Sequence, residues 1–407
     1  MRTKWVAGSV ALALLLAFGV GLYTGISERV QSTVFAAQSG AQPQDLDFSK
    51  FWRAWGLLDQ NFVETHASNT IPTYQERVYG AIAGLTDSYG DPYTVFFPPA
   101  DAKQFNEDIA GAFGGVGMEL GARDGSLTVV APLKGSPAEA AGVRSGDTVV
   151  GVDGKATEKM PVEQAVKLIR GEVGTTVALT LRRAGTASPL TLKIVRQTIQ
   201  VPVINFYNRG DGIFVIELYN FSENSVDLFR QALRQYFESG STKLVLDLRG
   251  NPGGYLDAAV QMASFFLPVG EVVVSEDFGG KQPDNRHRSL GYNVFANKKL
   301  SMAILVDQGS ASAAEILAGA LSQHGVAKLV GTRTFGKGSV QQLMELGGGA
   351  ELKVTVAQWL TPNGSSISDG GLQPDIEVEG KPARPDDFGR SGGDPQKEAA
   401  ITWFATQ

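Results

Sequence analysis

Two short motifs in the second half of the chain contain the residue types of a nucleophilic enzyme. Ser310 and Ser312 lie in Val306-Asp-Gln-Gly-Ser-Ala-Ser-Ala-Ala-Glu-Ile316, where an apolar strand is predicted to turn into a helix. Lys337 lies between glycines in Thr334-Phe-Gly-Lys-Gly-Ser-Val-Gln-Gln342. Apolar and glycine neighbours can partly desolvate a lysine, which lowers its pKa towards that of a base. The two motifs together predict Ser-Lys nucleophilic catalysis.

A third motif supplies candidates for binding the negative charge that such a reaction develops. Asp247-Leu-Arg-Gly-Asn-Pro-Gly-Gly-Tyr255 follows an apolar strand and precedes a predicted helix. Paired glycines there expose backbone amides at a helix N-terminus, which suits an oxyanion. Gly253 and Gly254 are the candidates, together with the amide of Ala313. A glycine turn that needs positive φ would leave the same pattern.

The residues alone do not decide which serine is the nucleophile. Ser310 can cap the following helix by accepting hydrogen bonds from its free amides. Ser312 can do the same, because Glu315 stands at the capping-box distance. Both readings stay open at this point.

Histidine is the alternative base, and the chain has three: His66, His287 and His324. His324 follows Ser312 on the same predicted helix at a separation of about 18 Å, too far for a hydrogen bond. His66 lies in the N-terminal region. His287 lies in a charged segment without a partner that the sequence reveals, so lysine is the better base and His287 the next one to test.

The lysine motif also resembles a phosphate-binding loop. Gly331-Thr-Arg-Thr-Phe-Gly-Lys-Gly338 matches Gly-x-x-x-x-Gly-Lys-Ser/Thr except at its last position. Gly338 there lacks the hydroxyl that binds magnesium, and residues 339–346 have no clear helical pattern. The sequence therefore does not favour nucleotide binding.

The amino-acid composition argues against several other classes of function. The chain has 407 residues, enough for two or three domains, and a net charge of −6 without a basic stripe, which argues against nucleic-acid binding. It has no cysteine and no His-Glu-x-x-His pattern, so we expect no disulfide, no thiolate chemistry and no metal site. No cofactor is expected.

The N-terminus has the pattern of an export signal or a membrane anchor. Charged residues at positions 2 and 4 precede an uncharged stretch at residues 5–27, which is long enough to cross a bilayer as a helix. Val34-Phe-Ala36 is a passable cleavage site but lies far from the apolar centre. We favour an uncleaved anchor at residues 1–27, a linker at residues 28–46, and an extracytoplasmic location in the periplasm or cell envelope.

The rest of the chain divides by pattern into four regions. Aromatic residues near helical spacing predict a helical region at residues 47–110, whose stripe packs internally or against a partner subunit. Short strands and one helix ending at Arg170 predict a β-rich domain at residues 111–198. Strands alternating with helices predict an α/β core at residues 199–381. Residues 382–407 are predicted to be a flexible connection and a C-terminal segment.

The middle domain resembles a PDZ domain in the order of its elements. A PDZ domain takes an extended C-terminal peptide as an added strand and holds its carboxylate with the amides of a glycine-rich loop. That loop would consist of Gly115, Val116, Gly117 and Met118.

The three motifs, with the PDZ domain before them, resemble the carboxy-terminal processing peptidases, also called tail-specific proteases. The likeness covers residues 47–380, and the serine motif departs from the family pattern Ser-Ala-Ser-Ala-Ser-Glu-Ile only at Ala314. The resemblance implies a multidomain α/β protein with a crotonase-like, ClpP-like protease core. It implies that Ser312 is the nucleophile, Lys337 the general base and Gln341 the residue that orients the lysine.

The resemblance also implies partners. The PDZ domain would capture the apolar C-terminus of a protein substrate and gate the active site, and Arg170 would contact the catalytic region in the active state. A homodimer and an activating adaptor are further expectations. The rivals are a PDZ scaffold with an inactive protease fold and a crotonase-like acyl hydrolase.

Overall fold

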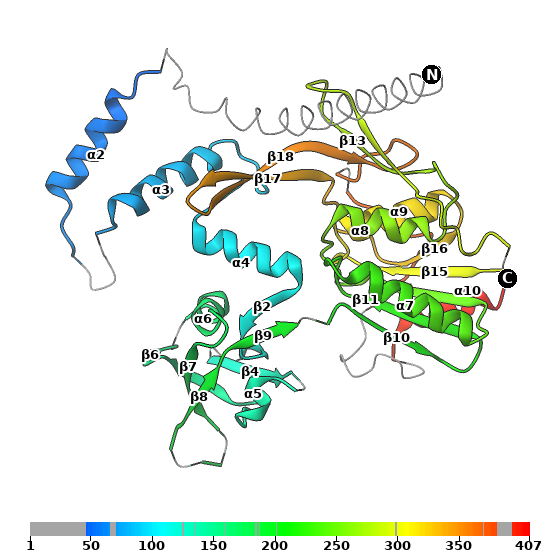
Figure 1. Ribbon diagram of the computed structural model, residues 1–407, viewed down its shortest axis with the longest axis horizontal. Coiled ribbons are helices and arrows are strands. Elements are labelled where there is room, and N and C mark those ends of the chain that lie inside the picture. The colour runs from blue at the N-terminus through cyan, green and yellow to red at the C-terminus, as the bar shows by residue number, and fades with distance from the viewer. Residues whose placement is uncertain are drawn as a thin grey trace, which may run out of the picture. The chain divides into compact units, whose positions relative to one another are not determined.

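The computed structural model describes residues 46–407 apart from residues 66–70, 124–125, 134, 159, 184, 187, 201, 298, 369 and 381–392. The chain divides into two compact units, Met1–Tyr74 and Gln75–Gln407 (Figure 1). The predicted signal or anchor, all of the predicted linker except residue 46, and His66 lie outside the described residues. Among the residues that are described, no helix combines the length and apolarity needed to cross a membrane.

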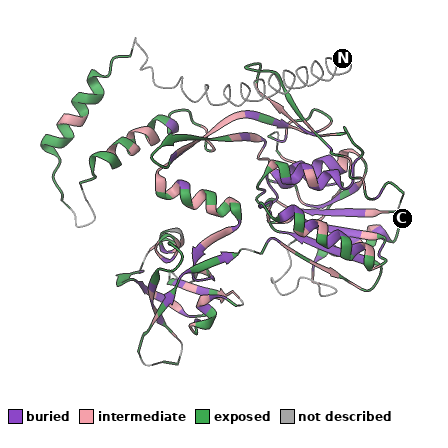
Figure 2. Ribbon diagram, viewed as in Figure 1, coloured by how far each residue is buried: buried purple, intermediate pink, exposed green. Residues whose placement is uncertain are grey.

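The first unit contains helix α2, Ser49–Asn61. Its aromatic and aliphatic side chains recur at helical spacing as expected, but none of its residues is buried (Figure 2). The stripe makes internal contacts among the aromatic rings of this unit, such as Trp55 stacked on Tyr74 with ring centroids 6.3 Å apart, but these contacts bury none of the helix. The large apolar residues of the segment that remain exposed are Phe48, Phe51, Trp52, Leu57, Leu58 and Phe62.

Two further helices follow: α3 at Tyr74–Asp87, which begins at the last residue of the first unit, and α4 at Pro99–Ala110 in the second unit. Proline at its first position and a left-handed glycine, Gly111, after its last one fix the ends of α4. Between the helices, β1 at Val95–Phe97 pairs with a distant strand. The sequence pattern assigned this stretch to the helical region at residues 47–110, because three residues are too few to show a strand period.

The PDZ domain forms around one antiparallel sheet with strand order β3-β4-β5-β7-β8, and β6 pairs with β5. A second pair, β2 with β9, lies at the two ends of the domain sequence. Alternate residues of the strands fill its core, for example Val177, Leu179 and Leu181. The elements are β2 Ala112–Gly115, β3 Met118–Arg123, β4 Ser126–Pro132, α5 Pro137–Ala140, β5 Thr148–Val152, β6 Lys155–Ala156, α6 Val162–Ile169, β7 Thr176–Arg182, β8 Leu190–Val195 and β9 Gln197–Gln200.

The core domain is built on a six-stranded sheet of order β10-β11-β12-β15-β16-β19, in which all neighbours after the β10–β11 pair are parallel. Its central strands are continuous apolar runs, as expected for a sheet covered on both faces. The strands are β10 Ile204–Asn208, β11 Ile213–Leu218, β12 Lys243–Asp247, β15 Ser301–Val306, β16 Ala327–Gly331 and β19 Ile376–Glu377.

Helices cover both faces of this sheet. Residues of one parity, such as Phe214 and Ile216, pack under α7 (Ser225–Glu238), α8 (Leu256–Ser264) and α9 (Ala313–Gln323). Residues of the other parity, such as Val215 and Val245, pack against α10 (Pro395–Phe404).

The C-terminal helix α10 was not predicted from the sequence. Ala400 and Phe404 of α10 lie against Val215 and Val245 of the sheet in one buried cluster. Asp394 caps the helix by accepting a hydrogen bond from the backbone of Lys397, and both residues are buried. The predicted flexible connection therefore ends before residue 394.

A second sheet adjoins the core and carries the lysine motif. It has the order β1-β18-β13-β14, and β17 forms a hairpin with β18. The absence of a helical pattern after the lysine is explained, since β17 is a strand that starts directly behind it. The strands are β13 Val272–Asp277, β14 Asn285–Arg288, β17 Ser339–Gly347 and β18 Ala350–Leu360.

Candidate active site

The serine motif forms a sharp turn between β15 and α9. Ser312 stands immediately before α9 with φ 55° and ψ −119°, a left-handed conformation that a side-chain-bearing residue rarely adopts. Such a conformation costs about 1–3 kcal/mol and persists only where the surroundings enforce it. The turn thus places Ser312 at the N-terminus of α9, and the strained backbone of this residue costs free energy of folding.

The two serines have different environments. Ser310 is fully buried, donates from Oγ to the carbonyl of Leu248 at 2.8 Å and accepts from the amide of Asp307 at 3.0 Å. Its hydroxyl therefore ties two loops together. Ser312 is only partly buried and lines a cavity.

Lys337 reaches the same cavity from the loop between β16 and β17. Burial lowers the pKa of its ammonium, and the nearby carboxylate of Glu315 opposes that shift. Its Nζ lies 5.6 Å from the centre of the Tyr93 ring. Gly338 cannot carry a side chain, because an added Cβ would lie 2.1 Å from the amide nitrogen of Ser368. Close packing against Ser368 therefore fixes the backbone directly after Lys337.

Glu315 joins the serine and lysine motifs. Its Oε2 accepts from the amides of Ser312 at 2.9 Å and Lys337 at 3.0 Å. Its Oε1 accepts from the hydroxyl of Thr334 at 2.6 Å and the amide of Gly336 at 2.8 Å. The side chain is fully buried, and burial raises its pKa although these hydrogen bonds work in the opposite direction. One carboxylate thus fixes the spacing of both motifs.

The glycine motif packs directly against the serine turn. A Cβ on Gly253, whose φ is +99°, would lie 2.8 Å from Cβ of Ser312 and 2.9 Å from the amide nitrogen of Ala313. The amide of Gly253 donates to Oδ1 of Asn251 at 2.9 Å. Gly253 therefore shapes the loop with an amide that already donates to Asn251, so Gly254 and Ala313 are the better candidates for oxyanion donors.

Gln341 lies on β17 beside the lysine, but its amide is engaged elsewhere. Its Nε2 donates to the hydroxyl of Ser339 at 2.6 Å and to the carbonyl of the same residue at 3.0 Å. The strand pairing shifts register between Val340 and Gln341. Neither Gln341 with Lys337 nor Lys337 with Ser312 forms a side-chain hydrogen bond here; in enzymes without bound substrate such hydrogen bonds are often long or unformed.

All the predicted catalytic residues nevertheless meet in one cavity of about 610 Å³. Helix α4, the serine turn, the glycine motif and the β17–β18 hairpin form its walls. The apolar part comes from residues such as Phe105, Ile109 and Trp359, and a second lysine, Lys353, reaches it from β18. The predicted residues that line it are Ser312, Ala313, Lys337, Gln341, Gly253 and Gly254.

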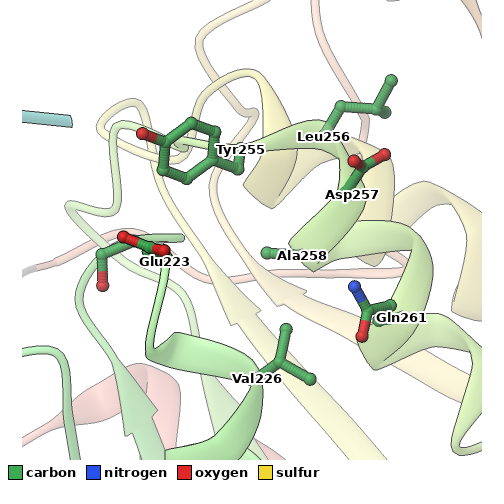
Figure 3. A pocket seen from close by; sticks show the side chains of 8 residues that line it. Glu223, Val226, Tyr255, Leu256, Asp257, Ala258 and Gln261 are labelled. Carbon is green, nitrogen blue, oxygen red and sulfur yellow. The ribbon is translucent and has the colours of Figure 1, made fainter. Parts of the chain in front are cut away.

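A second cavity of about 660 Å³ continues from the first. Ser222, Tyr255 and Leu256 line both cavities. Figure 3 shows Glu223 and Val226 on one side of this space and Ala258 and Gln261 of α8 on the other. The combined groove suits an extended chain better than a compact small molecule.

The predicted peptide-binding loop lies between β2 and β3. The carbonyl of Val116 accepts from the amide of Ala138 at 2.8 Å, and that of Gly117 accepts from Oγ of Ser136 at 2.8 Å. These bonds fix the loop formed by residues 115–118. Within the described residues β3 pairs with β4 alone, so its other edge is open to an added strand beside α6.

Arg170 follows α6 and connects the PDZ domain to the cavity wall. Its Nη1 lies 2.6 Å from Oδ1 of Asp108 on α4, and its guanidinium stacks over the ring of Phe113 at 3.9 Å. Asp108 lines the cavity. Arg170 therefore contacts a residue that lines the cavity, although it does not line the cavity itself.

The rival bases and ligand sites find no support in the described residues. His287 pairs with Glu276 at 3.1 Å, and His324 bonds to the carbonyl of Val272 at 2.8 Å; neither lines the cavity. Residues 331–338 lead into a strand rather than a helix, unlike a phosphate-binding loop. No cluster of metal-ligating side chains occurs among the described residues.

Comparisons with known proteins agree with this architecture. The model of the peptidase family S41 matches residues 212–378, and the model of the PDZ domain matches residues 128–183. The carboxy-terminal processing protease CtpB of Bacillus subtilis is 33% identical over 91% of this chain and 77% of its own length. A probable CtpA-like serine protease of Staphylococcus haemolyticus is 39% identical over 73% of this chain and 59% of its own length.

Among solved structures, the photosystem II D1 C-terminal processing protease is similar with a TM-score of 0.53, at 27% identity over 85% of this chain and 98% of that one. The fold and the cavity define a serine peptidase that carries a PDZ domain. The chain belongs to peptidase family S41, among its carboxy-terminal processing proteases.

Proposed function

We propose that the chain cleaves proteins near their C-termini by acyl transfer, with Ser312 as nucleophile and Lys337 as general base. Neutral Lys337 takes the proton of Ser312 while Oγ attacks the peptide carbonyl. The amides of Ala313 and Gly254 hold the oxyanion, and the protonated lysine gives its proton to the leaving amine. Water then attacks the acyl-enzyme and releases the new C-terminus. Gln341 orients Lys337 once the hydrogen bond between Gln341 and Ser339 is replaced by one between Gln341 and Lys337.

One observation carries this proposal. Three motifs that are separated in the sequence place their predicted catalytic residues around a single cavity, in which burial lowers the pKa of Lys337. If these residues served only as turn glycines and helix caps, nothing would require the three motifs to line the same cavity. The adjoining second cavity gives an extended peptide room on the side of Tyr255.

The test is cleavage of an unstructured protein with an apolar C-terminus by the region from residue 46 onwards. We expect Ser312→Ala and Lys337→Ala to abolish cleavage, whereas Ser310→Ala lowers stability and leaves a measurable rate. If Lys337→Ala cleaves as fast as the parent protein, the proposed base is wrong. A parent protein that binds the C-terminus without cleaving it under any condition would instead be a PDZ scaffold.

The PDZ domain is proposed to select the substrate. An apolar C-terminus would add to the open edge of β3, with its carboxylate at the loop of residues 115–118. Arg170 would couple this binding to the cavity through its ion pair with Asp108, and an adaptor could act at the same place. Sequence alone supports an extracytoplasmic site of action, through the charged start and apolar stretch at residues 1–27.

A second copy of the chain is the proposed partner of α2. The helix leaves Phe51, Trp52 and Leu58 exposed, and side chains of this type are enriched where subunits meet. A homodimer through α2 would bury them.

A further inference from the structure

The guanidinium of Arg249 is buried between two carboxylates from distant parts of the chain. It bonds to Asp247 through Nε at 2.9 Å and Nη2 at 2.5 Å. It bonds to Asp394 through Nη1 at 2.9 Å and Nη2 at 2.7 Å. All three side chains are almost fully buried. Bidentate contacts on both sides fix the orientation of the guanidinium.

Asp394 brings the C-terminal helix into this cluster. It stands just before α10, and Gln396 in the first turn of α10 adds a bond from Nη1 of Arg249 to its Oε1 at 3.1 Å. Burial disfavours the charge of Asp394, but Arg249 and then Lys397 hold the pKa of this carboxyl below its ordinary value. The carboxylate is therefore charged at neutral pH and binds Arg249 as an ion pair.

Arg249 itself belongs to the glycine motif, and that motif is tied to the serine turn at several points. The amide of Gly250 donates to Asp307 at 2.8 Å, and the amide of Ala311 donates to the carbonyl of Asn251 at 2.9 Å. A displacement of Arg249 would thus be passed to the backbone on which the proposed oxyanion donor Gly254 lies.

We propose that Asp394 is a positioning residue for the oxyanion loop, which we define as residues 248–254: the first turn of α10 holds Arg249 and thereby sets the backbone geometry of this loop. The inference rests on the proposed function for its catalytic consequence. A purely structural pair would instead attach α10 to the sheet and affect only stability. The two cases differ in where the backbone loosens and in whether turnover falls.

The direct test is hydrogen exchange of the loop, which does not depend on activity. Asp394→Asn keeps the size of the side chain and an oxygen that can cap α10, but removes the charge that holds Arg249. We expect faster amide exchange in residues 248–254. The control is Phe404→Leu, which weakens packing at the other end of α10 without touching Arg249. Equal exchange of the loop in Asp394→Asn and the parent protein would overturn the proposal.

Turnover gives the second readout. We expect Asp394→Asn to lower kcat by about tenfold to a hundredfold with a smaller change in KM, since a misplaced oxyanion donor affects the transition state most. Phe404→Leu should keep the kcat of the parent protein at a temperature where both variants are folded. An equal loss of kcat in the two variants would show that the Arg249–Asp394 pair only stabilises the fold and does not position the loop.

Two further variants keep the inference falsifiable if Asp394→Asn does not fold. Gln396→Ala removes one bond to Arg249 and should raise loop exchange to a smaller extent; an unchanged loop would count against the proposal. In an Arg249→Met background the same Gln396→Ala change should no longer affect the loop, because it acts through Arg249. If the loop loosens as expected while the parent protein lacks peptidase activity, the positioning role stands and the proposed function fails.

Discussion

Glu315 is the residue on which the geometry of the cavity depends most directly, since its carboxylate accepts from both catalytic motifs. Glu315→Gln keeps the shape but replaces one oxygen by an NH₂ group, so that two of the donors that it now binds would face another donor. An amide left without an acceptor in the interior costs about 1–3 kcal/mol. We expect a less stable protein and a loss of kcat of about a hundredfold or more, because the serine and lysine would separate.

The matched control is Glu139→Gln. Glu139 also lies in the first turn of a helix and accepts a backbone amide, that of Gly135 at 2.6 Å, but it is exposed in the PDZ domain. Urea unfolding and steady-state kinetics of both variants separate the two effects. Equal and small changes in both proteins would show that Glu315 is only a helix cap.

The proposed role of Lys337 as general base predicts the pH dependence of cleavage. The lysine acts as a base only when neutral, and burial lowers its pKa below the ordinary 10.5. The rate should therefore rise about tenfold per pH unit and level off at the pKa of Lys337, before pH 10.5. A kcat/KM profile measured within the folded range checks this. A rate that falls as pH rises from neutral would contradict a neutral lysine base.

Lys353 should influence the position of that profile. Burial lowers the pKa of Lys353, and repulsion by Lys337 adds to the effect. The repulsion is mutual, so Lys353→Met should raise the pKa of Lys337 and move the rising limb to higher pH. The exposed Lys193 of the PDZ domain offers a control, since Lys193→Met should leave the profile in place.

Some of these residues could be predicted from the sequence and others could not, for a physical reason. Ser312, Lys337 and the paired glycines stand in short motifs that can be recognised from consecutive residues of the sequence. Glu315 was visible only as a possible helix cap. The pairing of Arg249 with Asp394 joins residues far apart in the chain, and no local pattern encodes such a contact.

At the scale of elements, the glycine motif and the serine turn must approach each other closely. Gly253→Ala would place a methyl group 2.7 Å from the carbonyl oxygen of Ala311. Gly250→Ala is the matched control in the same loop, because its φ of +67° is also left-handed but nothing lies within 4 Å of an added Cβ. Both variants bear the left-handed strain of about 1–2 kcal/mol.

Only Gly253→Ala should therefore lose nearly all activity, through displacement of the nucleophile. Gly250→Ala should lower the melting temperature and keep most of its kcat. Thermal melts and cleavage rates of the two proteins check the difference. Equal activity in both would mean that the loop accommodates the methyl group without moving Ser312.

The elements that were predicted correctly are those with a clear period or a buried run. The parallel strands of the core are continuous apolar stretches, α7 and α8 show an apolar stripe, and α9 is buried over most of its length. The short β1 has no readable period. Helix α10 was missed because only some of its residues are apolar and its first turn is buried through charges, with Asp394 and Lys397 inside the protein.

For the whole molecule, the exposed face of α2 predicts assembly. Trp52→Ser with Leu58→Ser removes two large exposed apolar side chains of the helix. We expect the double variant to sediment as a monomer and the parent protein as a dimer, whereas the exposed Lys50→Ser should leave the dimer intact. A monomeric parent protein at micromolar concentration would remove the proposed α2 interface.

The ion pair between Arg170 and Asp108 predicts how peptide binding reaches the cavity. Arg170→Ala should leave the affinity of the PDZ domain for an apolar C-terminal peptide unchanged, because the residue lies outside the loop of residues 115–118. It should abolish the stimulation of cleavage by that peptide, a coupling that we expect to be about fivefold or more. Asp108→Ala should have the same effect, and the double variant should be no worse than either single one.

The structure offers a matched control for this coupling. Lys167 of α6 pairs with Asp101 of α4 at 2.8 Å, so it joins the same two helices, but Asp101 does not line the cavity. Lys167→Ala should keep the stimulation, which separates a general contact between the helices from a signal that passes through Asp108. Calorimetric peptide binding and cleavage with and without peptide give both quantities. Full, peptide-responsive activity in Arg170→Ala would show that binding reaches Ser312 by another route.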